Sequence, residues 1–299
     1  MARKTRTAAA RPTVGYLLRR SAARLARARL HYGHGTAGAR DDAAALVFHA
    51  LGLDHASAPG SYRLRVAGRD AARVDALVAR RIAERLPSAY LTGVSWFAGH
   101  EIHVTPDVLV PRSPIAELCA AGFAPWIDPA RVRRVLDIGT GSGCIAIAAA
   151  HALPRAHVDA SDVSRAARAV ARDNVRRHRL GARVRVVAAD VYDGLAGRRY
   201  DIVVSNPPYV ADPEMRRLPR EHRAEPASAL RAARRGLAVI ERIVAGARRH
   251  LTPQGILVVE AGSSAARVRR RYRDLPLVWL EFEHGFAEVF LLRAADLPG

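Results

Sequence analysis

The chain has 299 residues, of which 49% are hydrophobic and 25% charged, a composition typical of a globular protein with material for about two domains. No apolar stretch reaches the roughly 20 residues that a membrane-spanning helix needs, so no membrane partner is expected. Met1–Arg11 lacks the apolar segment of a secretory signal, and this favours a cytoplasmic location. Cys119 and Cys144 fit a reducing compartment and predict neither a disulfide framework nor a metal site.

The net charge of +20 would ordinarily indicate a nucleic-acid partner. Lys4 is the only lysine, however, and alanine is very abundant, which indicates a genome-wide compositional bias. Arginine clusters such as Arg176-Arg177 and Arg269–Arg271 fall in expected helices or loops, where solvated charge is the ordinary state. The charge therefore leaves two interpretations open: a compositional bias, or contact with rRNA or an assembling ribosome.

The first block of the chain predicts helices. Apolar residues recur at helical spacing, and they include Val14, Leu17, Leu18, Ala22, Leu25 and Ala28. Residues 43–51 and 74–86 repeat this pattern, and Pro59-Gly60 and Pro87 interrupt it. We expect a helical domain over residues 1–92 that recognises the substrate.

A β-hairpin linker is predicted over residues 93–112. β-forming and turn residues alternate through Trp96–Val104 and then Val108–Arg112. From residue 113 to 299 strands and helices alternate, which indicates an α/β domain with a parallel sheet covered by helices on both faces. The last two predicted strands, 277–282 and 287–292, are too close for a crossover helix and are expected to pair as an antiparallel hairpin.

A glycine-rich loop follows the predicted strand Val135–Ile138. The loop is Gly139-Thr140-Gly141-Ser142-Gly143, and the Ala-rich helical stretch Cys144–Ala152 comes next. Glycines let the backbone pass close to a ligand at a helix N-terminus. A dinucleotide fingerprint needs its third glycine one place later, where Cys144 stands. The tighter spacing favours S-adenosyl-L-methionine, which has no pyrophosphate, as the cofactor.

Acidic residues recur at the ends of three successive predicted strands. Asp137 lies near the end of the first strand, Asp162 follows strand 156–160, and Asp190 follows strand 184–188. Asp162 could accept hydrogen bonds from both ribose hydroxyls, and Asp190 is placed to reach the adenine edge. Ser164 is expected to cap the helix that begins at residue 165. Any one acid could be only a cap or turn residue, but their ordered recurrence favours cofactor binding.

Asn206-Pro207-Pro208-Tyr209 is the most informative motif. It ends the apolar strand Tyr200–Ser205, and prolines cannot continue a ladder, so a stiff turn is expected at the strand's carboxyl end. Its side-chain amide oxygen and backbone carbonyls could accept hydrogen bonds from an NH₂ group. The turn suits an enzyme that methylates a planar amide or amine nitrogen. A proline-stiffened strand exit, with Asn as an ordinary turn residue, is the alternative.

Together these motifs resemble the HemK-type protein-glutamine N5-methyltransferases, from about residue 13 to 293. Within that family, Val110-Pro111-Arg112-Ser113-Pro114 is similar to the branch that modifies the third protein of the large (50S) ribosomal subunit. The resemblance implies a Rossmann-like, seven-stranded class I S-adenosylmethionine-dependent methyltransferase domain. It also implies that Asn206, Pro207, Pro208 and Tyr209 hold the glutamine amide at the site of transfer.

Three alternatives remain open at this stage. The protein substrate could be the Gly-Gly-Gln of a release factor, as in the other branch of the family. An amino-methyltransferase acting on adenine in DNA or RNA can carry the same Asn-Pro-Pro-Tyr turn and must flip its base out of the stack. A ribosome-assembly factor that keeps the fold without catalysis is the third, and the intact glycine loop and Asn206 argue against it.

Overall fold

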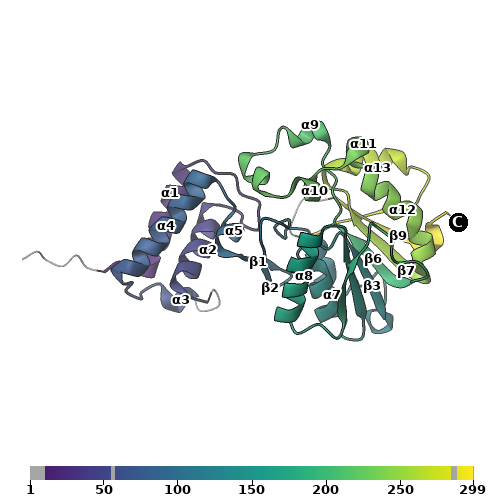
Figure 1. Cartoon of the computed structure of the whole chain (residues 1–299), viewed down its shortest axis with the longest axis horizontal. Helices are drawn as coiled ribbons and strands as arrows, with labels where there is room; N and C mark the ends of the chain where they lie inside the picture. Colours follow the sequence, from purple (N-terminus) through teal and green to yellow (C-terminus); the bar gives the residue numbers. More distant parts are fainter. Residues whose placement is uncertain (1–10, 55–57, 284–287, 299) are drawn as a thin grey trace, which may run out of the picture. The chain divides into compact units, whose positions relative to one another are not determined.

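The computed structural model describes residues 11–54, 58–283 and 288–298. The chain forms two compact units, Met1–Thr92 and Gly93–Gly299 (Figure 1). Within the described ranges, no helix combines the length and the apolar character needed to cross a lipid bilayer.

The first unit is helical. Its helices are α1 (Val14–Arg27), α2 (Ala39–Leu51), α3 (Ala58–Ser61), α4 (Gly68–Glu84) and α5 (Ser88–Thr92). The helical spacing seen in the sequence puts Leu17 of α1, Leu46 of α2 and Val78 of α4 into one core, where all three are 0% exposed. Thr13 caps α1 by accepting a hydrogen bond from the Tyr16 amide.

A charged pair lies inside this helical core. Arg81 Nε donates to Asp42 Oδ2 at 2.8 Å, and both side chains are 1% exposed. Ser88 Oγ and Thr36 Oγ1 each donate to Asp42 Oδ1 at 2.8 Å. The carboxylate is therefore fully engaged, as a buried charge must be if it is not to destabilise the fold.

The second unit alternates strands and helices. Its strands are β1 (Val94–Phe97), β2 (His100–His103), β3 (Arg134–Ile138), β4 (His157–Asp162), β5 (Val184–Ala188), β6 (Tyr200–Ser205), β7 (Leu251–Glu260), β8 (Val278–Leu280) and β9 (Val289–Arg293). Its α-helices are α6 (Ile115–Ala120), α7 (Cys144–Ala152), α8 (Arg165–Arg177), α9 (Asp212–Met215), α10 (Ala227–Leu230), α11 (Ala233–Gly236), α12 (Ala238–His250) and α13 (Ala265–Arg271). Short 3₁₀ helices cover Pro129–Arg131, Arg220–Ala224, Gly262–Ser264 and Ala294–Asp296.

The main sheet has seven strands in the order β5-β4-β3-β6-β7-β9-β8. The strands β5, β4, β3, β6 and β7 are parallel, whereas β9 is antiparallel to both of its neighbours, β7 and β8. This confirms the predicted α/β class and the predicted antiparallel pairing of the last two strands. Ala287, the first residue predicted for the final strand, lies outside the described residues.

Helices cover both faces of this sheet. On one face Leu136 and Val203 pack with Ile240 and Ile243 of α12 in a single buried cluster. Because strand side chains alternate, Asp137 points to the opposite face, where it accepts a hydrogen bond from the Ala146 amide of α7. Burial on both faces explains the continuous apolar runs at 202–204 in β6 and 256–259 in β7.

The β-hairpin is shorter than the sequence predicted. Strands β1 and β2 pair directly, with Phe97 opposite His100, across the two-residue turn Ala98-Gly99. Both turn residues have positive φ, 49° and 77°, as a tight hairpin of this twist requires. The predicted linker ran on to Arg112, but Val108–Arg112 form no strand, since Pro111 cannot donate to a ladder and the Val110 amide donates to Glu225.

Candidate active site at the carboxyl edge of the sheet

The glycine loop leaves β3 at Ile138 and enters α7 at Cys144. Gly139, Gly141 and Gly143 have φ of +70°, +55° and +84°, so their left-handed backbone favours glycine. A Cβ atom on Gly139 or Gly141 would meet nothing within 4 Å, which leaves open space beside this backbone. The loop therefore borders a space at the N-terminus of α7, where a ligand can approach main-chain amides.

Asp137 lies under the loop and is fully buried. Its Oδ2 accepts from Thr140 Oγ1 at 2.6 Å and from the Ala146 amide at 3.2 Å. Its Oδ1 is buried and has no hydrogen-bond partner among the described residues. Burial raises the pKa of Asp137 to about 7. A donor or cation supplied by a ligand would satisfy this oxygen.

Asp162 is the last residue of β4 and ties that strand to the glycine loop. Its Oδ2 accepts from the Gly141 amide at 3.0 Å, and its Oδ1 accepts from the Ser164 amide at 2.8 Å. Ser164 caps α8 as predicted, because its Oγ accepts from the Ala167 amide at 3.2 Å. Each carboxylate oxygen of Asp162 can accept a further hydrogen bond, so the side chain still has capacity for two hydroxyl groups.

Asp190 follows β5 and is exposed. Its Oδ1 accepts from Arg242 Nη1 at 2.8 Å, and Arg242 also lies 3.4 Å from Asp193 Oδ2. The sequence did not indicate this surface ion pair, because Asp190 and Arg242 are 52 residues apart.

The Asn-Pro-Pro-Tyr turn begins beside the glycine loop. Ser205, the last residue of β6, is paired with Ile138 in the parallel ladder, and its Oγ donates to the Ile138 carbonyl at 2.8 Å. Asn206 therefore follows β6 at the level where Gly139 follows β3. Asn206 is half-buried, and none of the described residues hydrogen-bonds to its side-chain amide. Its acceptor oxygen is available to a ligand.

Tyr209 anchors the end of this turn. Its hydroxyl donates to Glu260 Oε1 at 2.9 Å, and its carbonyl accepts from Ser264 Oγ at 2.7 Å. Its ring lies against Gly262, where an added Cβ would come within 2.4 Å of the ring. Burial raises the pKa of Tyr209 far above its ordinary value, so the hydroxyl remains a donor.

Glu260 at the end of β7 supports the Asn-Pro-Pro-Tyr turn, a contact that the sequence did not reveal. It is 2% exposed, and Ser113 Oγ donates to its Oε2 at 2.5 Å. Burial raises the pKa of Glu260, although its two hydroxyl partners and Arg112 oppose this effect. Glu260 thus connects Tyr209 with the segment that follows the hairpin.

A second carboxylate holds the segment that follows the turn. Arg112 donates through Nη1 to Glu225 Oε1 at 2.5 Å and through Nη2 to Glu225 Oε2 at 2.8 Å. The Glu225 side chain is 0% exposed, and this two-point geometry fixes both partners. Arg112 therefore ties the segment that contains α9 and α10 to the chain before α6.

Asn174 of α8 links the hairpin to the glycine loop. Its Oδ1 accepts from the His103 amide at 2.8 Å, and its Nδ2 donates to the His103 carbonyl at 2.8 Å and to the Ser142 carbonyl at 2.9 Å. The side chain is 0% exposed. No local pattern marks it, since its partners lie 71 and 32 residues away.

Parallel topology brings the predicted site residues to one edge of the sheet. Asp162 ends β4, and residues 139–143, Asp190 and Asn206 follow β3, β5 and β6, whose carboxyl ends point the same way as that of β4. The strand order reverses between β3 and β6, and ligands bind at such switch points in open α/β sheets.

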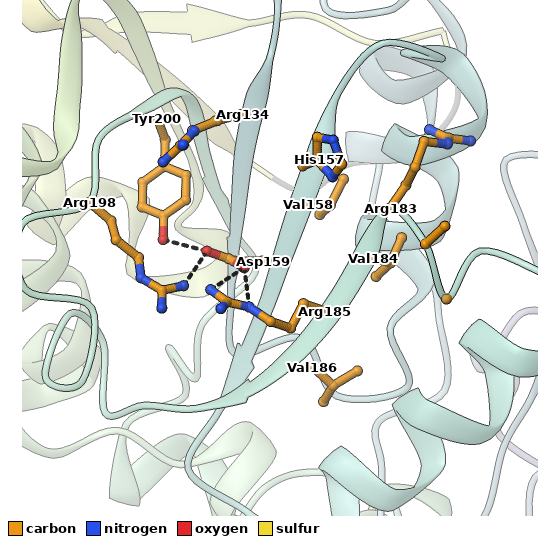
Figure 2. Close-up of a pocket in the computed structure, with 12 residues that line it drawn as sticks. Arg134, His157, Val158, Asp159, Arg183, Val184, Arg185, Val186, Arg198 and Tyr200 are labelled. Carbon is orange, nitrogen blue, oxygen red and sulfur yellow. Dashed lines mark hydrogen bonds and ion pairs between the residues drawn. The ribbon is translucent and has the colours of Figure 1, made fainter.

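A separate pocket of about 750 Å³ opens at the amino ends of these strands (Figure 2). Asp159 lies at its centre and accepts from Tyr200, Arg198 and Arg185 at 2.8, 2.9 and 3.0 Å. Because the pocket is at the opposite end of the strands from Asn206, it is not part of the candidate active site.

Comparison with known proteins identifies the family. Residues 120–221 match the family described as the methyltransferase small domain. The chain is 43% identical over 286 residues to the ribosomal protein uL3 glutamine methyltransferase of Bordetella pertussis, covering 95% of this chain and 96% of that protein. The chain belongs to this methyltransferase family. The Xanthomonas campestris member is 42% identical and covers 95% of this chain and 92% of its own length.

Solved structures support the fold of this methyltransferase. The catalytic domain of hMettl16, in complex with a MAT2A 3'UTR hairpin, aligns with a TM-score of 0.50 at 19% identity. The alignment covers 79% of this chain and 83% of that one. At this identity the likeness concerns the fold alone, and it agrees with the seven-stranded sheet described above.

Proposed function

We propose that this enzyme transfers a methyl group from S-adenosyl-L-methionine to the side-chain amide nitrogen of a glutamine in ribosomal protein uL3. One observation carries the proposal: Asn206, whose side-chain amide has no partner among the described residues, follows β6 at the level where the glycine loop follows the neighbouring strand β3. The relatives at 43% and 42% identity are named for this reaction. A ribosomal substrate would place the reaction in the cytoplasm, where the positive charge of the chain suits surroundings rich in rRNA.

The residues at the carboxyl edge fit the cofactor. S-adenosyl-L-methionine supplies an electrophilic methyl group on a positively charged sulfur. The unpartnered Asp137 Oδ1 suits a cationic ligand, and the open space beside Gly139 and Gly141 admits one against the backbone. Asp162 retains acceptor capacity for ribose hydroxyls. Asp190 would reach the adenine edge through the oxygen that does not pair with Arg242.

The Asn-Pro-Pro-Tyr turn would orient the glutamine. An amide nitrogen is a poor nucleophile because its lone pair is delocalised into the carbonyl, so it must be held in line with the methyl group. The Asn206 side-chain oxygen accepts one amide hydrogen, and the Pro207 carbonyl accepts the other. Both hydrogen bonds strengthen as positive charge develops on nitrogen, so they favour the transition state over the ground state.

The two prolines and Tyr209 keep these acceptors in place. Pro207 and Pro208 restrict the backbone of the turn, and Tyr209 is fixed by Glu260 and Ser264. No general base is required before transfer, because the N-protonated amide cation that would form, as S-adenosyl-L-homocysteine leaves, is strongly acidic and can lose its proton to water.

Replacing Asn206 tests the proposal. We expect Asn206→Ala to lower turnover on purified uL3 by about 10²–10³-fold, the effect of losing one oriented polar group at a reacting centre. Cofactor affinity should change little. Turnover is measured by transfer of a labelled methyl group, and affinity by calorimetry. Near-normal turnover of the variant would contradict the role of Asn206.

The substrate is tested separately. Mass spectrometry of ribosomal proteins from cells with and without the gene should show one methyl group on a single uL3 glutamine only when the gene is present. In the labelled-methyl assay, uL3, release factors and RNA are offered in parallel. Labelling of release factors or RNA instead of uL3 would refute the proposed substrate while leaving the role of Asn206 intact.

A further inference from the structure

Three histidines from distant parts of the chain meet in the second unit. His100 begins β2, His151 lies in the last turn of α7, and His178 caps the C-terminus of α8. One ring nitrogen from each lies within 4.8 Å of the other two. The glycine loop and Ser164 are at the opposite, N-terminal ends of α7 and α8, so this cluster is separate from the candidate active site.

The ring nitrogens have a spacing that suits a metal ion. His151 Nε2 and His178 Nδ1 are 3.3 Å apart. A tetrahedral zinc ion with zinc–nitrogen bonds of about 2.0–2.1 Å holds neighbouring ligand atoms about 3.3–3.4 Å apart. The His100 ring stacks on His151 with centroids 4.3 Å apart and meets the His178 ring edge-on at 5.9 Å. The His100 ring must turn out of this stack to point a nitrogen at the same ion, since an imidazole binds a metal in its ring plane.

The surrounding backbone leaves a lone pair on His178 available. His178 Nε2 lies 2.8 Å from the Glu101 carbonyl oxygen, which can only accept, so Nε2 carries the hydrogen. Nδ1 then presents its lone pair toward His151. A histidine ligand whose second nitrogen donates to a carbonyl is the usual arrangement at metal sites, because the hydrogen bond fixes the ring.

The helix ends favour a cation at this point. The C-terminal ends of two helices, α7 and α8, meet here, and the negative ends of their dipoles stabilise positive charge. The positive charge of Arg183, which interacts with His151, opposes part of this effect. Histidine side chains with the ordinary pKa of about 6.5 are mainly neutral at pH 7, the state that binds metals.

We propose that His100, His151 and His178 bind one divalent transition-metal ion, with Zn²⁺ as the preferred ion. Three imidazoles in tetrahedral geometry suit zinc, and the exposure of His151 leaves the fourth position to water. The bound ion fastens β2 to the ends of α7 and α8. The sequence predicted no metal site because the ligands are dispersed, with His151 and His178 27 residues apart.

Metal binding by the full chain, without a histidine tag, tests this proposal. After removal of metal with a chelator, the protein is titrated with Co²⁺, whose visible absorption reports tetrahedral nitrogen ligands, and Zn²⁺ is then added as competitor. We expect one ion per chain. His151→Ala should weaken Co²⁺ and Zn²⁺ binding at least about tenfold, since even residues that only orient a metal ligand account for 10–100-fold.

His157→Ala is the matched control, because His157 is an exposed histidine of the same unit outside the cluster. It should bind Co²⁺ and Zn²⁺ as the unaltered protein does. Circular dichroism verifies that both variants are folded, and His100→Gln serves as a second cluster variant. Absence of ion uptake by the unaltered chain, or equal affinity of the His151→Ala and His157→Ala variants, would overturn the proposal. Neither result depends on methyl transfer.

Discussion

Asp137 combines complete burial with one unpartnered oxygen. Thr140 and Ala146 occupy its Oδ2, while Oδ1 has no partner among the described residues. Burial raises its pKa to about 7, which means that the carboxyl group of the unliganded protein changes charge near neutral pH. A positively charged cofactor beside Oδ1 would favour the ionised form and lower this pKa, so cofactor binding and proton release would be coupled.

This coupling predicts that cofactor affinity depends on pH. Below about pH 7 the carboxyl group is protonated and must lose its proton to pair with a cation, so the affinity should rise as the pH increases toward 7 and then level off. A one-proton linkage permits at most about a tenfold change in affinity per pH unit. Calorimetric titration with S-adenosyl-L-methionine between pH 6 and 8.5 measures the effect.

Asp137→Asn is the control for that measurement. The variant cannot ionise at this position, so it should retain only the pH dependence that comes from the ligand itself. Identical pH profiles for the two proteins would show that Asp137 does not contact the charged part of the cofactor.

At the scale of elements, the Asn-Pro-Pro-Tyr turn is held by groups from two other segments. Glu260 of β7 receives the Tyr209 hydroxyl on one oxygen and the Ser113 hydroxyl on the other. Only the first of these hydrogen bonds reaches the turn itself. Replacing Tyr209 removes a contact of the turn, whereas replacing Ser113 removes a contact elsewhere. Comparing the two variants therefore separates an effect on the orientation of the turn from an effect on stability alone.

We expect Tyr209→Phe to lower the free energy of unfolding by about 1–3 kcal/mol, because a buried oxygen of Glu260 loses its partner. Turnover should fall as well, since the turn is less firmly held. Ser113→Ala removes the other partner, so it should destabilise the protein by a similar amount with a smaller effect on turnover. Denaturant unfolding and the methyl-transfer assay compare the two variants. Equal turnover losses would show that Tyr209 has no role beyond stability.

At the scale of the whole molecule, each unit has its own core. The helical unit depends on the Asp42–Arg81 pair, in which both side chains are 1% exposed. We expect Asp42→Ala to destabilise this unit by about 3–5 kcal/mol, because Arg81 would remain buried without its charge partner. Affinity for S-adenosyl-L-methionine should stay within twofold, since the predicted cofactor residues all belong to the second unit. Calorimetric unfolding and cofactor titration measure the two effects.

Asp75→Ala is the comparison for Asp42→Ala. Asp75 accepts from Arg20 and Arg24 at 2.6 and 2.8 Å, but its side chain is 41% exposed. Surface pairs of this kind contribute about 0–1 kcal/mol, so the variant should remain close to the unaltered protein. If Asp42→Ala lowered both the stability and the cofactor affinity, and Asp75→Ala lowered neither, the two units would not have independent cores.

Local sequence predicted the elements that carry the candidate site. Helix α7 has the bounds predicted for it, and Ser164 caps α8, because apolar periodicity and capping are properties of neighbouring residues. Parallel topology then brought the glycine loop, Asp162 and Asn206 to one edge. The hairpin was predicted to extend to Arg112 and ends at His103, since alternation at Val108–Arg112 does not reveal that the Val110 amide donates to Glu225.

The supporting residues could not be predicted in the same way. Glu260 and Tyr209 are 51 residues apart, and Glu225 and Arg112 are 113 residues apart. Such contacts depend on the folded arrangement of the strands, and no spacing rule in one sequence encodes them. The cluster of His100, His151 and His178 could not be predicted for the same reason.

Asn174 gives the second unit a mechanical connection. A single buried amide holds the backbone of His103 on one side and the backbone of Ser142 on the other. The hairpin and the glycine loop are therefore coupled through this side chain. A displacement of the His103 backbone would be passed on to the backbone of Ser142.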